Sequence, residues 1–520
     1  MDFLAPHFLQ NIRLIQGGMG VYVSNFRLAN AVAACHPGVT AGTVSGTALD
    51  VVYVRLLQLG DPGGHVRTAL AAFDSKFQVD IGAKIIDQYL VVGGKKPHER
   101  YRYGPRQTLR TMNGRQTIPL PSEPAQPVQL MVDQELIELL IATAFAEVWL
   151  AKRGHEGKVL INFLHKVQLP LVYALYGAML ADVDGIVVGA GNPEGLPEIC
   201  SRLTQHLPVT TEHALLYRES GETFQVDFDP QMIAGGRLVE QPLKRPAFLA
   251  IVSLESQVGA LVKSLSSVLS TEPPDGFIIE HHTAGGHNAP PQGPLQKDAL
   301  DQPIYSSQDE PNLEEIRRYN KPFWLAGGYN NREKLREAIS AGATGVQIGS
   351  SFALAQESGL DPVHKTALLT ALQQGTADAD LVRTTLYSPT GYPFKVAQLP
   401  DTLADDGVYE NRPRICDLGF LQQRGFLKPG PDGERELFAR CPAGPLADFK
   451  QKRGLPFNAE GKRCLCNGLL AAVGLGQTHP TNGDEPAIVT LGNNLDGVRR
   501  LSRLGQMPYW ACDVVNDLLA

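Results

Sequence analysis

Residues 322–351, PFWLAGGYNNREKLREAISAGATGVQIGSS, decide the fold, because they predict a strand, a helix and a second strand in direct succession. The two apolar runs, 322–326 and 345–348, show no alternation of apolar and polar residues. Such runs suit parallel strands that are covered by helices on both faces. We therefore expect a strand–helix–strand unit of a parallel sheet.

The stretch between the two runs carries the signals that begin and end a helix. Asn330 is expected to cap the helix, with Glu333 three residues further on, and Gly342 is expected to end it. The apolar stripe of this helix is Leu335, Ala338 and Ile339. A second helix is expected near the N-terminus, where either Ser24 or Asn25 could be the cap.

Short apolar runs rich in valine and isoleucine recur along the chain, and helix-like stretches separate most of them. Eight such runs can be counted, which is the number of strands in a (β/α)8 barrel. They span residues 13–16, 38–41, 158–163, 185–188, 248–252, 276–279, 322–326 and 345–348. We therefore predict an α/β fold built on a (β/α)8, or TIM, barrel.

The spacing of the runs predicts how the chain is divided. A long insertion, about residues 46–157, separates the second and third strands, and another, about 200–245, follows the fourth. After about residue 395 the alternation of strands and helices stops, and proline- and glycine-rich turns take over in a stretch that holds five of the seven cysteines. We expect a barrel domain over residues 1–395 and a C-terminal extension over 396–520 that packs on the barrel.

Composition and charge exclude several classes of protein. The formal net charge of −7 over 520 residues argues against a nucleic-acid partner and against binding to anionic membranes. No run of 18 apolar residues occurs, and the N-terminus lacks the basic and apolar regions of a signal peptide. Seven cysteines spread over a long chain favour a reducing setting over a disulfide framework. We therefore expect a cytoplasmic enzyme.

Four of the predicted strands end in turns of glycine and other small residues, at the face of a barrel where active sites lie. These turns are residues 16–20, 189–191, 326–328 and 347–351. Gly327 and Gly328 follow the seventh strand, and Gly349 and Ser350 follow the eighth. A single glycine pair after a strand is more often a plain turn, but two such turns on consecutive strands favour a monophosphate site made of backbone N–H groups.

Flavin mononucleotide, FMN, matches this pattern. Its phosphate would lie at the turns after the last two strands, and its ring would lie over the turn after the first. No G-x-G-x-x-G or G-x-x-x-x-G-K-[ST] sequence lies between a strand and a helix, so a usual nicotinamide or ATP site is not indicated. The turn residues that we assign to the cofactor are Gln16, Gly17, Gly18, Met19, Gly327, Gly328, Gln347, Gly349 and Ser350.

A single histidine stands in the turn after the sixth predicted strand. His287 follows Gly285 and Gly286, and residues without a Cβ let the main chain approach a flat ligand closely. An imidazole can accept a proton near neutral pH. One histidine taken alone is as often structural as catalytic, but its place in this turn favours catalysis. His281 and His282 would point to opposite faces of a continued strand, so at most one would face the site.

Taken together, these motifs resemble the nitronate monooxygenase family, also called 2-nitropropane dioxygenase-like. The resemblance covers nearly the whole chain and points to the long bacterial branch of that family. It rests on residues 15–21, 45–50, 175–181, 284–291, 345–350 and 388–395. The most specific elements are Ala-Gly-Gly-His at 284–287 and Gln-x-Gly-Ser at 347–350.

The resemblance implies an FMN-dependent oxidoreductase that oxidises nitronates or nitroalkanes with O2. His287 would remove the α-proton of a nitroalkane or would steer a bound nitronate. Asn162 would contact the flavin ring, and Gly285 and Gly286 would also bind the cofactor. The partners would be a small-molecule substrate and O2, with no nucleic acid and no membrane, and a homo-oligomer is left open.

A second class of function stays open. FMN-dependent enoyl reductases of polyketide and fatty-acid pathways resemble this family in fold and in their glycine turns. They require NAD(P)H as the reductant, whereas the oxidation of nitronates needs no nicotinamide cofactor. A test of whether a nitronate or NAD(P)H reduces the flavin would therefore separate the two classes.

Four cysteines of the C-terminal extension form a candidate metal site. Cys416, Cys441, Cys464 and Cys466 could hold zinc or an iron–sulfur cluster through four thiolates. Only the last two are closely spaced, as a C-x-C pair, which is a weaker signal than two C-x-x-C pairs. Four buried or free thiols are therefore an equal alternative.

Overall fold

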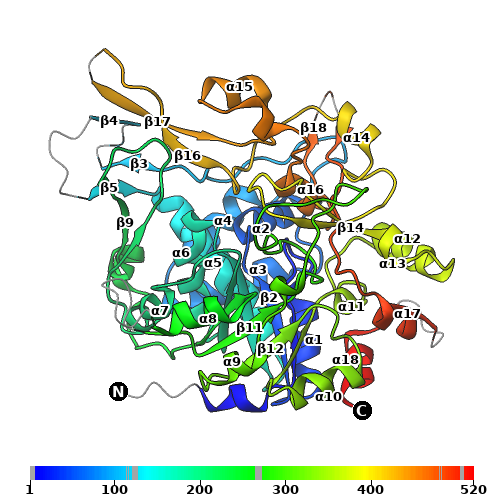
Figure 1. Ribbon diagram of the computed structural model, residues 1–520. Coiled ribbons are helices and arrows are strands. Elements are labelled where there is room, and N and C mark those ends of the chain that lie inside the picture. Colours follow the sequence, from blue (N-terminus) through cyan, green and yellow to red (C-terminus); the bar gives the residue numbers. More distant parts are fainter. Residues whose placement is uncertain are drawn as a thin grey trace.

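The computed structural model describes residues 6–112, 114, 116–119, 127–263, 272–431, 433–479, 481, 483–503 and 509–520. Eight parallel strands form a closed barrel in the order β1-β13-β12-β11-β10-β7-β6-β2 (Figure 1). Their bounds are β1 Leu14–Gln16, β2 Thr40–Ser45, β6 Lys158–Leu164, β7 Gly185–Gly189, β10 Ala247–Val252, β11 Gly276–Glu280, β12 Phe323–Ala326 and β13 Gly345–Ile348. Each predicted run overlaps one of these strands, so the predicted (β/α)8 barrel is confirmed.

Apolar side chains fill the interior of the barrel. One buried cluster joins residues of strands around the barrel, among them Ile15, Leu160 and Trp324. The indole N–H of Trp324 donates a hydrogen bond to the carbonyl of Ile12 at 2.8 Å. Ile12 belongs to the same cluster, so the segment before β1 closes the amino-terminal end of the barrel.

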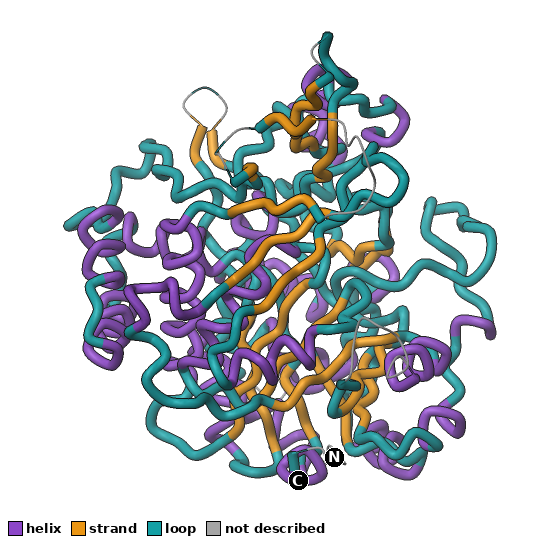
Figure 2. Tube along the Cα trace, turned by 90° about the vertical axis from the view of Figure 1, so that its left-hand side faces the viewer, coloured by secondary structure: helices purple, strands orange, loops and turns teal. Residues whose placement is uncertain are grey.

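Helices cover the barrel, and Figure 2 shows them on both sides of the strands that run through the middle of the molecule. Their bounds are α1 Phe26–Cys35, α2 Leu49–Gln58, α3 His65–Phe77, α4 Ile81–Tyr89, α5 Gln134–Ala151, α6 Gln168–Leu180, α7 Leu196–Thr204, α8 Glu255–Lys263, α9 Leu313–Arg317, α10 Arg332–Ser340, α11 Ser350–Ala353, α12 Pro362–Gln373, α13 Asp378–Leu381, α14 Asp406–Asn411, α15 Leu446–Gln451, α16 Leu465–Ala471, α17 Asp496–Arg503 and α18 Ala511–Leu519. Short 3-10 helices are η1 His7–Asn11, η2 Pro230–Gly236, η4 Ser307–Asp309 and η5 Pro456–Ala459. Within the described ranges, none of these helices is long and apolar enough to cross a bilayer.

The helix caps show where tertiary contacts change a local prediction. Asn331, and not Asn330, caps α10, because its side-chain oxygen accepts a backbone N–H of the first turn at 2.8 Å. The amide of Asn330 instead donates to Asn494, a distant residue that passes over this turn. The predicted cap is therefore wrong by one residue. In the apolar stripe, Ile339 is 41% exposed, whereas the other two residues are buried. For α1 the cap is Asn25.

The two insertions and the C-terminal extension share small sheets. β3 Arg110–Thr111, β5 Val128–Met131, β9 Phe224–Phe228 and β8 Val209–Glu212 form one sheet in that order, which joins the first insertion to the second. In another, β4 Thr117–Pro119 pairs with β17 Glu434–Arg440, which pairs with β16 Gln423–Phe426 (Figure 1). Two further hairpins are β14 Val382–Thr385 with β15 Phe394–Ala397, and β18 Thr478–His479 with β19 Gly483–Asp484. The segments outside the barrel are thus linked to one another by backbone pairing.

The last helix of the chain returns to the first helix of the barrel. Figure 1 shows α18 beside α1 and α10, and a disulfide joins Cys35 of α1 to Cys512 of α18 across a separation of 477 residues. The sequence-based expectation that cysteines stay unpaired is therefore wrong for these two. Their pairing depends on the docking of α18 on α1, which no local spacing indicates.

A buried carboxylate ties the end of α5 to the third and fourth barrel strands. Asp184 accepts hydrogen bonds from Lys152 at 2.8 Å, Lys158 at 3.1 Å and the backbone N–H of Val159 at 3.1 Å. We expect Asp184→Asn to lower the free energy of unfolding by about 2 kcal/mol at pH 7, because charged hydrogen bonds are lost in a buried place. Urea unfolding measures this, and Asp182→Asn, which removes an exposed carboxylate 4.0 Å from Lys152, is the matched control.

The pH dependence of this effect has a defined sign. Burial by itself would raise the pKa of the Asp184 carboxyl, but the charges of Lys152 and Lys158 outweigh burial and hold the pKa below its ordinary value. The stabilisation is therefore present above an unfolded-state pKa of about 3.9 and is lost as the pH falls through the lower, folded-state pKa. The difference between parent and variant should shrink at acid pH. A difference that grows on acidification would contradict this reading.

Candidate active site at the barrel mouth

A pocket of about 250 Å³ opens at the carboxyl ends of the barrel strands. The turns after β1, β11, β12 and β13 line it, as predicted for the catalytic face of this fold. Of the predicted site residues, those that line the pocket are Gly17, Gly18, Met19, Asn162, Gly285, Gly286, His287, Gly327, Gly328, Gln347, Gly349 and Ser350. Only the tertiary structure brings them together, since they come from six strands or turns.

Gln16 has a different place from the one predicted. Its side chain is fully buried beneath the turn that follows β1. The amide donates to Ser24 at 2.8 Å and accepts from the backbone N–H of Thr43 at 2.9 Å. The hydroxyl of Ser24 in turn accepts from the N–H of Met19 at 2.8 Å and donates to the carbonyl of Gly17 at 3.0 Å. Gln16 therefore supports the turn from below instead of lining the pocket.

Gly18 lies against the side chain of Asn162. A Cβ on Gly18 would be only 2.2 Å from the Cβ of Asn162, which no pair of side chains can tolerate. Glycine is thus required here so that the β1 turn can approach β6. The consequence is a flat backbone surface at the pocket floor, which suits a planar ligand.

The turns after β12 and β13 leave room beside their backbone. Gly327 and Gly328 have φ of 99° and 83°, values that other residues rarely adopt. Gln347 lines the same pocket, and its buried side-chain oxygen has no hydrogen-bond partner among the residues that the structure describes. An unpaired acceptor of this kind suits a ligand that carries an N–H donor, as the flavin ring system does.

His287 lies in the turn after β11, the strand that pairs with β12, and it lines the same pocket as these turns. Its Nε2 is 2.8 Å from the hydroxyl of Ser388, which is 2.7 Å from the hydroxyl of Thr390. Burial disfavours the charged ring, and the nearby charge of Lys166 adds to this, so that the pKa of His287 is lowered to about 3. At neutral pH the imidazole is therefore uncharged and a weak base. This favours the steering of a bound nitronate over the deprotonation of a neutral nitroalkane.

Glu280 is a site residue that the sequence reasoning missed. It is the last residue of β11 and lines the pocket. Burial raises the pKa of its carboxyl to about 8, although the charge of Lys395 opposes this. The carboxyl is thus largely protonated at neutral pH and can donate a hydrogen bond. A polar residue that ends an apolar barrel strand was the signal that could have identified it.

The C-terminal extension forms a roof over the pocket, which was also missed. Thr490 accepts a hydrogen bond from the N–H of Gly286 at 2.9 Å, and the N–H of Gly492 donates to Ser350 at 2.8 Å. The other residues of the extension that line the pocket include Phe420, Leu421, Leu465, Cys466, Leu469, Leu491 and Asn494. Most are apolar, so the roof presents an apolar surface to whatever binds below it.

His281 and His282 lie beside the site and not in the pocket lining. β11 ends at Glu280, so the alternation of a continued strand does not apply to them. His281 contacts Glu310 at 2.9 Å through Nε2, and the ring of His282 stacks on Tyr305 with centroids 4.0 Å apart. Both have structural partners. The expectation that at most one of them faces the site agrees with this arrangement.

The four cysteines predicted as metal ligands gather at a second, small cavity in the extension. Cys466 lines both this cavity and the larger pocket. Because these cysteines come from three separate segments, the structure joins residues that the sequence left far apart.

The comparisons with known proteins agree with the motifs. Residues 240–386 match the family described as nitronate monooxygenase, and this stretch holds the His287 turn and both predicted phosphate turns. A protein of Bacillus subtilis (strain 168) named "Probable nitronate monooxygenase" is 42% identical over 67 residues. The similarity to the nitronate monooxygenase family thus covers residues 240–386 of the chain. The predicted resemblance is thereby confirmed for the family, although the matched segment is 13% of this chain and only 18% of the Bacillus protein.

Solved structures resemble this chain over most of its length. FabK from Thermotoga maritima is 14% identical, covers 98% of this chain and 93% of its own, and has a TM-score of 0.45. The nitroalkane oxidase from Streptomyces ansochromogenes is also 14% identical, with 97% of this chain and 94% of its own covered and a TM-score of 0.40. Both likenesses are weak in identity and in TM-score.

Proposed function

We propose that the protein is an FMN-dependent oxidoreductase that oxidises nitronates with O2. The observation that carries this proposal is the pocket that His287 lines together with the glycine turns after β1, β12 and β13. The family match at residues 240–386 supports it. When bound, FMN would supply the electron acceptor, and the protein would supply binding, orientation and proton transfer.

The residues of this chain have separate tasks in the proposal. The turns with Gly328, Gly349 and Ser350 would hold the phosphate through backbone N–H groups. The oxygen of Gln347 would accept from the flavin ring, and Gly18 with Asn162 would form the floor beneath it. These assignments rest on two observations. The side-chain oxygen of Gln347 has no hydrogen-bond partner among the described residues, and a Cβ on Gly18 would collide with Asn162.

His287 and Glu280 would act on the substrate. The uncharged imidazole of His287 can donate a hydrogen bond from Nδ1 to a nitronate oxygen when its Nε2 accepts one from the hydroxyl of Ser388. Protonated Glu280 can donate another. Two neutral donors suit an anionic substrate, because neither repels the charge of the nitronate.

A second candidate function is the FMN-dependent reduction of an enoyl group by NAD(P)H. The observation that favours it is the apolar roof, to which Phe420, Leu421 and Leu465 contribute. Such a surface suits a long acyl chain, whereas a small nitronate needs little apolar area.

Anaerobic stopped-flow reduction of the flavin separates the two. Purified protein is first tested for a yellow, dissociable FMN, and is then mixed with a preformed nitronate or with NADPH in the absence of O2. Bleaching by the nitronate alone supports the first function, and bleaching by NADPH alone supports the second. A colourless protein that does not bind FMN on reconstitution would overturn both.

Glu280 predicts a pH limit for the proposed activity. Ionisation above a pKa of about 8 would place a negative charge in the pocket, so kcat/KM for a preformed nitronate should fall about tenfold per pH unit above that value. Lys395, whose pKa burial lowers to about 8, is the neighbouring group that loses its charge over the same range. Glu280→Gln, which mimics the neutral carboxyl, should flatten the profile between pH 7 and 10.

The matched control for this profile is Glu310→Gln. This carboxylate lies near the site on His281 but is 56% exposed. Its variant should keep the parent profile. A profile that stays unchanged in Glu280→Gln would show that another group sets the alkaline limb.

A further inference from the structure

Four of the five free cysteines lie together in the C-terminal extension. Cys416 lies in the loop before β16, Cys441 follows β17, and Cys464 and Cys466 lie at the start of α16. Cys441 and Cys464 form one buried cluster, and Cys416 and Cys466 pack against it. All four line the same small cavity. The fifth free cysteine, Cys200, is buried in α7 far along the chain.

The four sulfur atoms are arranged as two pairs. Cys416 and Cys441 interact with each other, and so do Cys464 and Cys466. Among the residues that the structure describes, no three of these sulfur atoms lie within 4.8 Å of one another. The arrangement is thus two close pairs on either side of a cavity, and not one compact group of four.

Most of the cavity lining around the sulfurs is apolar, but one sulfur has a polar partner. The side-chain amide of Gln422 donates to the sulfur of Cys416 at 3.4 Å. Hydrogen bonds of this kind to sulfur are among the features that tune iron–sulfur centres. Gly444 lies close to Cys416, since a Cβ on it would be 3.1 Å from the Cβ of the cysteine. Glycine at this position lets the Cys441 loop come near the Cys416 loop.

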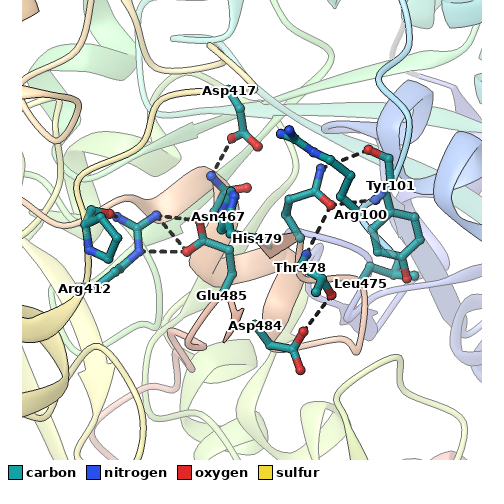
Figure 3. Close-up of polar contacts among 12 residues, drawn as sticks. Arg100, Tyr101, Arg412, Asp417, Asn467, Leu475, Thr478, His479, Asp484 and Glu485 are labelled. Atoms are coloured by element: carbon teal, nitrogen blue, oxygen red, sulfur yellow. Dashed lines mark hydrogen bonds and ion pairs between the residues drawn. The ribbon is translucent and has the colours of Figure 1, made fainter. Parts of the chain in front are cut away.

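A network of side chains holds the cysteine-bearing segments in place, as Figure 3 shows for part of it. Asn467, next to Cys466, donates to Asp417, next to Cys416, at 2.6 Å. Arg412 forms a two-bonded ion pair with Glu485, with both contacts at 2.7 Å. These contacts do not involve the sulfurs, so the four thiols are left for another partner.

We propose that Cys416, Cys441, Cys464 and Cys466 together bind a metal centre through four thiolates. This goes beyond the proposed function, since the site lies in the extension. Four thiolates select zinc or iron–sulfur centres. One zinc ion at about 2.3 Å from each sulfur would need all four sulfurs within about 3.8 Å of one another. Two close pairs instead match two bridged irons, each of which takes one pair. The spacing therefore favours the iron–sulfur form.

The test begins with the full-length protein purified without O2. Iron, zinc and acid-labile sulfide are measured per chain, and the dithionite-reduced protein is examined by electron paramagnetic resonance. We expect about two irons and two sulfides per chain. About one zinc without sulfide would support a four-thiolate site but would contradict the iron–sulfur form that the spacing favours. If both metals stay below about a tenth of an equivalent, also after reconstitution with Fe²⁺ and sulfide or with Zn²⁺, the proposal is overturned.

Variants locate the metal. Cys416→Ser and Cys464→Ser, one from each pair, should each lose most of the bound metal, whereas Cys200→Ser should retain it. Circular dichroism and FMN content show whether a variant is folded, and they are measured independently of the metal. Full metal content in both pair variants would overturn the assignment. If the parent protein lacked bound FMN or did not turn over nitronates, this would contradict the proposed function alone and would leave the metal proposal unaffected.

Discussion

Replacing Gly18 with alanine is expected to weaken FMN binding by about a hundredfold or more, which corresponds to about 2.7 kcal/mol. The new Cβ would lie 2.2 Å from the Cβ of Asn162, which is anchored in β6. One of the two must move, and overpacking of this kind is not relieved by a side-chain rotation. Because both residues line the pocket, the displaced turn would enter the space that we assign to the flavin ring. Fluorescence titration of the apoprotein with FMN measures the effect.

Gly104→Ala is the matched control for this prediction. A Cβ there would be 3.6 Å from the nearest side-chain atom, on Val54, which is an ordinary contact outside the pocket. This variant should bind FMN as the parent does. Thermal unfolding of each apoprotein tells a local change from a global one. If a folded Gly18→Ala protein bound FMN within about threefold of the parent, the flavin ring would not lie over this turn.

The second large effect concerns a buried ion pair that joins the second insertion to the extension. Arg435 of β17 contacts Glu222 through two hydrogen bonds of 2.8 and 2.5 Å, and the two side chains are only 1% and 4% exposed. Glu222→Ala would leave the guanidinium buried without its carboxylate. We expect the free energy of unfolding to fall by about 3–5 kcal/mol, the usual range when one partner of a buried pair is removed. Urea unfolding followed by circular dichroism measures it.

Two further variants make this prediction specific. Glu436→Ala removes an exposed carboxylate from the same strand and should change the free energy of unfolding by less than about 0.5 kcal/mol. The double variant Glu222→Leu/Arg435→Leu should be more stable than Glu222→Ala, because it leaves no buried charge. A Glu222→Ala protein as stable as the parent would mean that this pair does not hold the two segments together.

The candidate site could be predicted in the parts that depend on neighbours in the chain. Gly327, Gly328 and His287 follow apolar strands directly, so the strand pattern already assigned them to the catalytic face. Gln16 was misjudged because its position at the end of β1 does not show that Ser24 and Thr43 bind its amide from below. The protonation states of the site residues could not be predicted from the sequence. The low pKa of His287 and the high pKa of Glu280 both arise mainly from burial, which depends on the complete fold.

By itself, the sequence determined the barrel and its catalytic face. Apolar runs, helix caps and glycine turns act over a few residues, so their spacing is sufficient to predict the strands and the end at which a ligand would bind. The tertiary structure alone decided which distant segments complete that site. Thr490 and Gly492 reach the turns of the barrel, Cys35 meets Cys512, and three loops bring four cysteines to one cavity. These contacts join residues far apart in the chain, and they form only because buried surfaces of the extension and the barrel pack against each other.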